Sequence, residues 1–296
     1  MSNKIAHGLE LSKQSWGALQ KNKQLLIFPV ISLIGLSIIT ALFFIPEAAL
    51  LGSTESIGAG DGTQDGFQWL MFMVILFIYY LITYFVIIFS NTALIGASLK
   101  LINGEPATVS DGIRVALSRL GKILVFAIIS ATVGVIARST SQAGRNSDNI
   151  IVAILAAVAG ALIQGAWNML VFFALPVMVV ENLPLKASLK RSLEIFKQTW
   201  GEGFTGTTAV GGISCLVYLA ILIVTGSIIA GGYFLESLPV MFIGGILLVI
   251  GFVVVGLLNG AVNGIFQASL YHFAKTGNAG PFIDTRLAQE AFRQQG

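Results

Sequence analysis

Long apolar segments separated by short polar ones dominate the pattern of this sequence. None of the apolar segments carries an acidic or basic side chain in its middle. A bilayer core of about 30 Å takes about 20 helical residues, so each segment can cross once. The positions do not alternate between apolar and polar, which favours helices over the strands of a barrel. The pattern predicts six transmembrane helices, over residues 25–45, 67–99, 122–137, 150–180, 208–235 and 238–273.

The composition supports a membrane protein. Hydrophobic residues make up 55% of the 296 residues and charged residues only 10%, and the mean hydropathy is +0.86. Soluble domains do not reach these values. The single cysteine, Cys215, lies in an apolar segment, which excludes a disulfide framework or a cysteine metal cluster. The basic isoelectric point reflects membrane topology, and we expect no nucleic-acid partner.

The distribution of basic residues predicts the orientation. Of the 17 lysines and arginines, all except Arg138 and Arg145 fall in the terminal segments or in the loops after the second and fourth spans. Arg138 also closes the third and shortest span. By the positive-inside rule these segments, and with them both termini, lie in the cytoplasm. We therefore expect a multi-pass membrane protein.

A repeated motif divides the chain. Residues 9–17, LELSKQSWG, recur at 193–201 as LEIFKQTWG, and Ile113 and Leu120 keep the same seven-residue spacing in a degenerate third copy. Each copy precedes a pair of apolar segments. We therefore predict three parallel repeats, at 1–103, 104–182 and 183–296, each an interfacial amphipathic helix followed by a transmembrane hairpin. Independent amphipathic connectors are the alternative.

The three amphipathic helices are expected to lie in the headgroup plane. Their predicted interfacial anchors are the residues that end the seven-residue spacing, Trp16, Leu120 and Trp200. Lysines on the opposite faces are expected to contact anionic lipid headgroups. These are Lys13, Lys186, Lys190 and Lys197.

Amide side chains recur in the closing helix of each hairpin. In lipid such groups need partners, so they are expected to face the bundle interior. They either join helices to one another or line a polar cavity or pathway. The candidates are Asn91, Gln164, Asn168, Asn259, Asn263 and Gln267. Beside the last three lies a stripe of small residues that predicts close helix packing: Gly256, Gly260 and Gly264.

Motifs of enzymatic chemistry are missing from the sequence. It has no phosphate-binding loop with Lys-Ser/Thr and no His-Glu-x-x-His motif. Its only two histidines are His7 and His272. The Ser and Thr residues are scattered, and none adjoins a histidine that could act as its base. We therefore expect no enzyme, no metal and no cofactor.

The Lys-Gln-Ser/Thr-Trp lead, the three hairpins and the final Ala268-Ser269-Leu270-Tyr271 before Gly277 resemble a group of uncharacterised prokaryotic six-span membrane proteins. That group is similar to the membrane-embedded domain attached to some glycerophosphodiester phosphodiesterases. The catalytic domain of those enzymes has no counterpart here, so the resemblance implies a multi-pass location in a prokaryotic cytoplasmic (inner) membrane and a link to lipids rather than catalysis.

The sequence thus predicts an all-α membrane protein with six transmembrane helices. The leading functional hypothesis is a non-enzymatic, homo-oligomeric assembly that acts as a scaffold or a conduit. The alternative is a carrier for lipids or small solutes, with a polar cavity between the hairpins.

Overall fold

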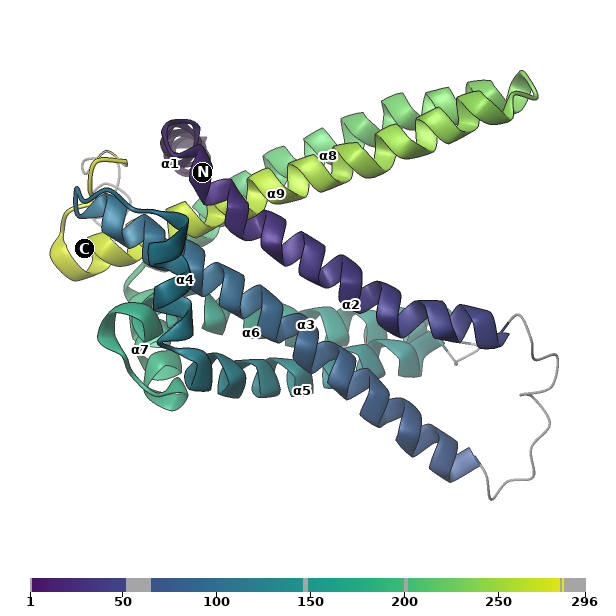
Figure 1. The fold of residues 1–296 in the computed structure, drawn as a ribbon, viewed down its shortest axis with the longest axis horizontal. Helices are drawn as coiled ribbons and strands as arrows, with labels where there is room; N and C mark the ends of the chain where they lie inside the picture. The colour runs from purple at the N-terminus through teal and green to yellow at the C-terminus, as the bar shows by residue number, and fades with distance from the viewer. Residues whose placement is uncertain (1, 52–64, 146–148, 200–201, 283, 285–296) are drawn as a thin grey trace. The chain divides into compact units, whose positions relative to one another are not determined.

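The long apolar segments of the sequence form long helices in the computed structural model, which describes residues 2–51, 65–145, 149–199, 202–282 and 284. These residues contain no β-strand. Six of the helices are long and apolar enough to cross a membrane. The helices are α1 (Ser2–Lys21), the short 3₁₀ helix η1 (Lys23–Leu26), α2 (Ile27–Leu51), α3 (Asp65–Ile102), α4 (Val109–Leu117), α5 (Leu120–Arg145), α6 (Ile150–Glu181), α7 (Leu185–Thr199), α8 (Glu202–Phe234) and α9 (Leu238–Thr276) (Figure 1).

The prediction of an all-α protein with six apolar helices is confirmed for the described residues. The six predicted segments correspond to α2, α3, α5, α6, α8 and α9. The chain divides into two compact units. Unit 1 comprises Met1–Val30, Leu94–Gly112 and Glu194–Gly296, and unit 2 comprises Ile31–Ala93 and Ile113–Leu193.

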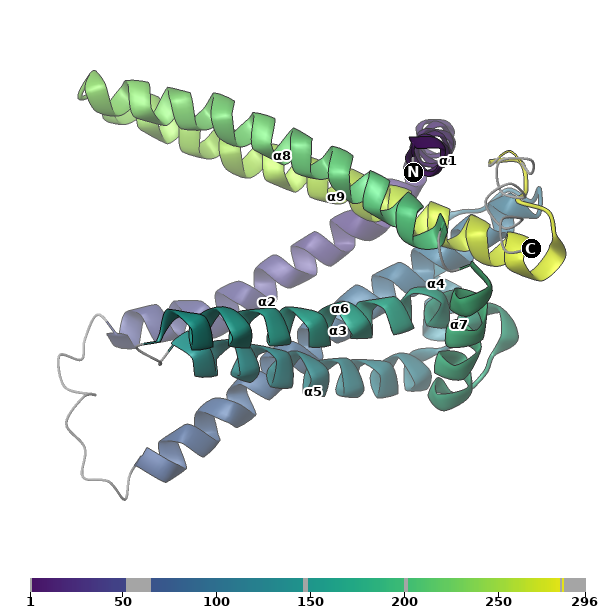
Figure 2. The same ribbon diagram turned by 180° about the vertical axis from the view of Figure 1, so that it is seen from behind.

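Unit 1 contains the hairpin of α8 and α9, which lie side by side along their length (Figures 1 and 2). Glycines allow this close packing. A Cβ added to Gly244 would lie 2.7 Å from Ile229, and one added to Gly232 would lie 2.8 Å from the backbone nitrogen of Met241. Helix α1 packs against both helices of the hairpin, and η1 contacts α1 and α9.

Unit 2 contains the hairpin of α5 and α6, also packed side by side (Figure 2). The tightest contact is at Gly160 of α6, where an added Cβ would lie 2.6 Å from the backbone oxygen of Ala137 on α5. Gly134 of α5 faces the ring of Tyr84 on α3, with 3.0 Å from an added Cβ to that ring. Glycine therefore sets the distance between helices in both units.

The closing helix of each hairpin ends in a stretch that is buried on all sides. In α3 this stretch is 92–99, in α6 it is 173–178, and in α9 it is 264–271. The three helices are 38, 32 and 39 residues long, more than the roughly 20 that a bilayer core requires. Each closing helix thus combines an exposed apolar part with a fully packed end.

Several helix boundaries differ from the sequence-based expectation; for example, α2 ends at Leu51 rather than at residue 45, and α8 begins at Glu202 rather than at residue 208. The second amphipathic helix, expected to carry both Ile113 and Leu120, ends at Leu117, and Leu120 begins α5. The Ser118 hydroxyl donates to the carbonyl of Val115 at 2.7 Å, and the Arg119 amide bonds to the Ala116 carbonyl three residues back. These bonds tighten the last turn and end the helix.

Helix α5 continues to Arg145 instead of ending at residue 137. Apolarity decides which residues enter lipid, but a helix continues as long as its backbone hydrogen bonds are made. The Thr140 hydroxyl bonds back to the Ile136 carbonyl at 2.8 Å, and no proline interrupts the segment. Arg138 therefore lies exposed within α5 rather than at its end.

Helix α4 begins with a reciprocal cap. The Thr108 amide donates to the Asp111 carboxylate at 2.8 Å, and the Asp111 amide donates to the Thr108 hydroxyl at 3.3 Å. This is the capping-box arrangement, with Asp in the place of the more common Glu. Lys100 of α3 adds an ion pair to Asp111 at 3.2 Å. The cap fixes where α4 starts.

This cap predicts a loss of α4 stability in acid. Hydrogen bonds from the Thr108 amide and hydroxyl, together with Lys100, lower the pKa of Asp111 to about 2. Because the folded-state pKa lies below the ordinary value near 4, the contribution is complete above about pH 4 and disappears as the pH falls through about 2. We expect amide hydrogen exchange in 109–117 to be slower in the wild type than in Asp111→Asn at neutral pH, with the two converging in acid. A difference that does not change with pH would contradict this mechanism.

Candidate functional site

The amides of α6 form a short network in unit 2. Gln164 and Asn168 are one helical turn apart, and Gln164 Nε2 donates to Asn168 Oδ1 at 3.0 Å. The Tyr84 hydroxyl of α3 donates to Gln164 Oε1 at 3.4 Å. Tyr80, one turn away on α3, stacks on Tyr84 with 6.0 Å between ring centroids. The structure thus brings two of the predicted amides together and adds two tyrosines.

The rotation of α6 about its axis is set by its inner face. Trp167 is 9% exposed, and its Nε1 donates to the hydroxyl of Ser130 on α5 at 3.1 Å. Gly160, seven residues earlier, makes the tight contact with α5 described above. With this face held against α5, Asn168 points outward and is exposed, whereas Gln164 is half-buried.

The amides of α9 lie in unit 1 and have different surroundings. Asn259 Oδ1 accepts a hydrogen bond from the hydroxyl of Ser214 on α8 at 2.8 Å. Asn263 Oδ1 is buried and has no hydrogen-bond partner among the described residues. Gln267 is 9% exposed and lies in the packed end of α9. The sixth predicted amide, Asn91, is half-buried on α3 in unit 2.

The three predicted packing glycines of α9 are not equivalent. A Cβ on Gly264 would lie 2.8 Å from Leu94 Cγ, so α3 and α9 approach closely there. A Cβ on Gly260 would lie 3.7 Å from Pro29, and one on Gly256 would lie 3.6 Å from the Tyr218 hydroxyl. These are ordinary contacts. The structure places close packing at Gly264, the member within the buried end of α9.

The predicted interfacial residues are placed as follows. Trp16 is 38% exposed on α1, where the neighbouring Ala18 and Leu19 are buried. Leu120 is 40% exposed. Trp200 lies outside the described residues, as does the side chain of Lys197. Lys13, Lys186 and Lys190 are exposed, and Lys13 lies 4.0 Å from Glu10.

Sequence reasoning missed the basic side chains that cap the end of α6. Lys122 Nζ donates to the backbone carbonyl and side-chain oxygen of Asn182, and Arg119 Nη2 donates to the Val179 carbonyl at 3.4 Å. Positive groups at the C-terminus of a helix satisfy its free carbonyls and its dipole. Asn182 itself has a left-handed backbone, φ 52°. The Asn-x-Pro after an apolar run was the available signal for this helix end.

Sequence reasoning also missed Tyr84, Ser130 and Trp167. Each of these side chains has a single polar group and lies within an apolar segment, so the hydropathy pattern does not distinguish it from its apolar neighbours. Periodicity places Trp167 on α6 but cannot show that a serine on another helix receives its indole hydrogen bond.

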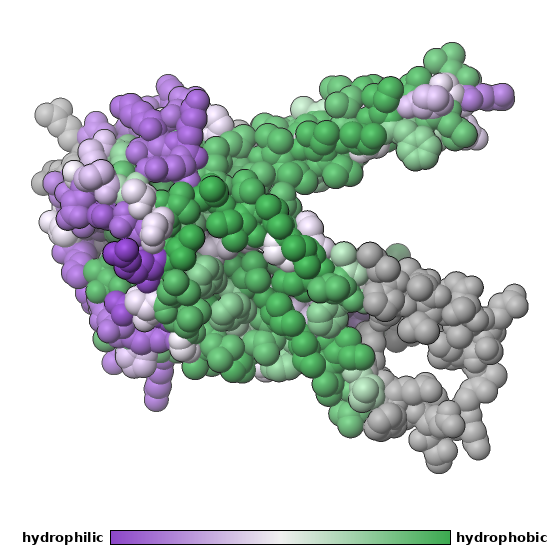
Figure 3. Space-filling model, in the orientation of Figure 1, coloured by the Kyte–Doolittle hydropathy of each residue, from purple (hydrophilic) through white to green (hydrophobic). Residues whose placement is uncertain are grey.

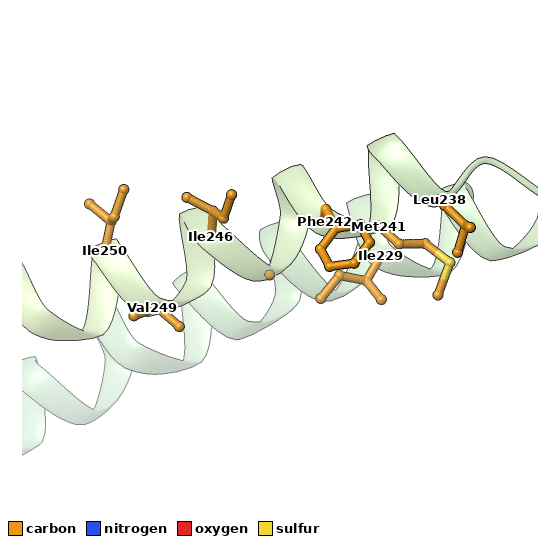
Figure 4. Close-up of a pocket in the computed structure, with 8 residues that line it drawn as sticks. Ile229, Leu238, Met241, Phe242, Ile246, Val249 and Ile250 are labelled. Atoms are coloured by element: carbon orange, nitrogen blue, oxygen red, sulfur yellow. The ribbon is translucent and has the colours of Figure 1, made fainter. Parts of the chain in front are cut away.

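An apolar groove runs along the outer part of the α8–α9 hairpin (Figure 4). Its labelled side chains contain no nitrogen or oxygen atom. Figure 3 shows the same hairpin covered with hydrophobic residues along most of its length, whereas hydrophilic residues gather over α1. Apolar side chains of this kind are suited to contact with the acyl chains of lipids. The groove is lined by Ile229, Leu238, Met241, Phe242, Gly245, Ile246, Val249 and Ile250.

In the part of the chain that the structure describes, no group of three or more His, Cys, Asp or Glu side chains is placed to hold a metal ion. The amides, hydroxyls and phenols described above bind by neutral hydrogen bonds.

The six apolar helices define a polytopic, helical membrane protein. The chain belongs to DUF6159, a family of unknown function, whose sequence profile matches residues 70–282. A comparison with curated proteins gives no match. Neither comparison connects the chain with glycerophosphodiester phosphodiesterases, so that resemblance stays a prediction.

Proposed function

We propose that this protein is a non-enzymatic membrane protein that assembles with copies of itself and acts as a scaffold or a conduit. The observation that carries the proposal is the exposed apolar surface of the α8–α9 hairpin within unit 1. Beyond the buried end of α9, the outward side chains of this hairpin are exposed, among them Leu216, Ile223, Phe242 and Ile250. Two helices alone enclose no pathway, so a conduit would need other helices beside this hairpin.

The exposed amide of α6 supports self-assembly as well. Lipid chains can cover an apolar face, but they offer no hydrogen bond to Asn168. Polar side chains within membranes typically pair with other helices. A purely lipid-facing α6 would leave the N–H donors of the Asn168 amide without a partner.

The proposed setting is a prokaryotic inner membrane with both termini in the cytoplasm. We attribute the three buried helix ends, 92–99, 173–178 and 264–271, to the cytoplasmic side, next to the basic segments. The recurrence of a short helix before each hairpin and a buried end after it favours the three-repeat interpretation. Lys13, Lys186, Lys190 and Lys197 would then contact anionic headgroups.

Counting subunits tests the proposal. Cys215 is the only cysteine of the chain and is exposed on α8, so a maleimide dye marks each copy once. In nanodiscs taken directly from the membrane, we expect two or more photobleaching steps per particle, and native mass spectrometry should give a multiple of 31.4 kDa. Cys215→Ser serves as the unlabelled control. Single steps and a single-chain mass would rule out self-assembly.

A carrier for a neutral solute or a lipid headgroup is the second candidate. It is favoured by Asn263, whose buried Oδ1 has no partner in the described part of unit 1. Unpaired buried acceptors are uncommon and call for a bound polar group or water. A carrier predicts that Asn263→Leu removes co-purifying lipid or solute while the oligomer persists. Unchanged bound material would leave the scaffold as the better interpretation.

A further inference from the structure

Two basic side chains gather at the start of α5 without a compensating acid. Arg119 directly precedes the helix and Lys122 lies in its first turn, which contains no acidic residue. Neither side chain forms an ion pair among the residues that the structure describes. Glu181, the last residue of α6, pairs instead with Arg191 at 3.8 Å. Because the N-terminus of a helix is itself positive, two further cations there are unfavourable unless an anion joins them.

The carbonyls at the end of α6 occupy only part of this basic pair. Arg119 Nη2 donates to the Val179 carbonyl at 3.4 Å, and Lys122 Nζ donates to Asn182. A guanidinium has five N–H donors and an ammonium has three. The Nε of Arg119 is buried and has no partner in the described part of the chain. Carbonyl groups carry only partial charges, so two full positive charges remain to be neutralised.

The backbone beside the pair offers further donors. The first hydrogen bond of α5 runs from the Ile123 amide to the Arg119 carbonyl at 2.9 Å. Three amides precede this bond and point out of the helix, those of Leu120, Gly121 and Lys122. A Ser, Thr, Asp or Asn at the N-cap usually accepts from such amides, but Arg119 stands there and its side chain has no acceptor. Gly121 is exposed, and a Cβ added to it would meet no atom within 4 Å, so the amides can be approached.

The position of these donors along α5 fits a lipid headgroup. Helix α5 is apolar enough to cross a membrane from Leu120 onward. The donors therefore lie where the hydrocarbon core ends and the headgroup region begins. All of them, and the α6 carbonyls that hold the two side chains, belong to unit 2.

We propose that the Arg119–Lys122 site, made of these two side chains and the three amides, binds a phosphate group, which its depth assigns to the headgroup of an anionic lipid. A phosphate supplies the missing negative charge and several acceptor oxygens. Charge-assisted bonds from a guanidinium and an ammonium suit such oxygens, and free amides at a helix start add to them. The inference goes beyond the proposed self-assembly and rests only on the proposed insertion of α5 in the membrane.

Native mass spectrometry of delipidated protein titrated with phosphatidylglycerol tests the site. We expect the wild type to retain one tightly held lipid per chain. Arg119→Gln should weaken this retention by about 30-fold, the effect of losing charge-assisted hydrogen bonds. Arg114→Gln removes the same charge from an exposed arginine of α4 and should weaken it by at most about 5-fold. Equal losses in the two variants would overturn the inference.

Arg119→Lys separates binding from folding. The variant keeps the charge at this position, so it should retain most of the lipid binding that Arg119→Gln loses. If a carboxylate of the chain itself covers the site, Arg119→Gln will instead lower the melting temperature of the lipid-free protein and leave lipid retention unchanged. That result would overturn the inference.

Inorganic phosphate distinguishes the two sources of the anion. We expect phosphatidylglycerol to raise the melting temperature of the wild type far more than inorganic phosphate does. Equal protection by inorganic phosphate would contradict the assignment to a lipid. The mass spectra also count subunits, so the two proposals fail separately. A monomer that retains the lipid refutes self-assembly and leaves the Arg119–Lys122 site intact, whereas an oligomer that retains no lipid refutes the site alone.

Discussion

Replacement of Gly160 by valine is expected to destabilise the α5–α6 hairpin by about 3 kcal/mol, the upper end of the usual range for overpacking. An added Cβ would overlap the Ser141 hydroxyl and lie 2.6 Å from the backbone oxygen of Ala137. The serine can rotate away, but the backbone oxygen can move only if α5 moves. Titration with sodium dodecyl sulfate, followed by circular dichroism, measures the free energy of unfolding in micelles.

Gly121→Ala is the matched control. Gly121 lies on α5 of the same hairpin, and an added Cβ there meets no atom within 4 Å. The higher helix propensity of alanine predicts unchanged or slightly greater stability, by up to about 1 kcal/mol. Equal effects of the two substitutions would show that helix propensity, rather than the contact with Ala137, governs Gly160.

Trp167→Ala is expected to produce the other large effect, a loss of about 3 kcal/mol or more. The substitution empties the volume of a buried indole between α5 and α6 and leaves the Ser130 hydroxyl without its donor. The free energy of unfolding in micelles is again the measurement.

Two milder variants separate packing from hydrogen bonding at this position. Trp167→Phe retains most of the ring volume and loses the indole N–H, and Ser130→Ala removes only the acceptor. Each is expected to cost about 1 kcal/mol. A loss in Ser130→Ala as large as that in Trp167→Ala would mean that the hydrogen bond, and not the packed ring, holds the hairpin together.

Much of the fold could be predicted because the signals were local. An apolar run that is long enough to cross a bilayer specifies a transmembrane helix, and all six predicted runs are helices in the structure. The ends of the helices were harder to predict from the sequence. The break after Leu117 depends on backbone bonds at Ser118 and Arg119, and the continuation of α5 past Arg138 involves polar residues that hydropathy excludes.

The candidate site was predicted in its residue types but not in its grouping. The helical spacing already placed Gln164 beside Asn168. It could not show that Tyr84 would bond to this pair, nor that Asn259 would find Ser214, because these partners are separated by 80 and 45 residues along the chain.

By itself the sequence determined that this chain is an all-α membrane protein with six lipid-compatible helices, since hydropathy and length depend on each segment alone. Tertiary structure decided which side of each helix is covered. Gly160 and Gly165 are alike in sequence terms, yet one touches the backbone of α5 and the other faces open space. The same applies to Trp167 and Asn168, neighbours that point in different directions because a serine on α5 binds the first. Contact depends on what a second helix places opposite a residue, and that information is not contained in the residue's own segment.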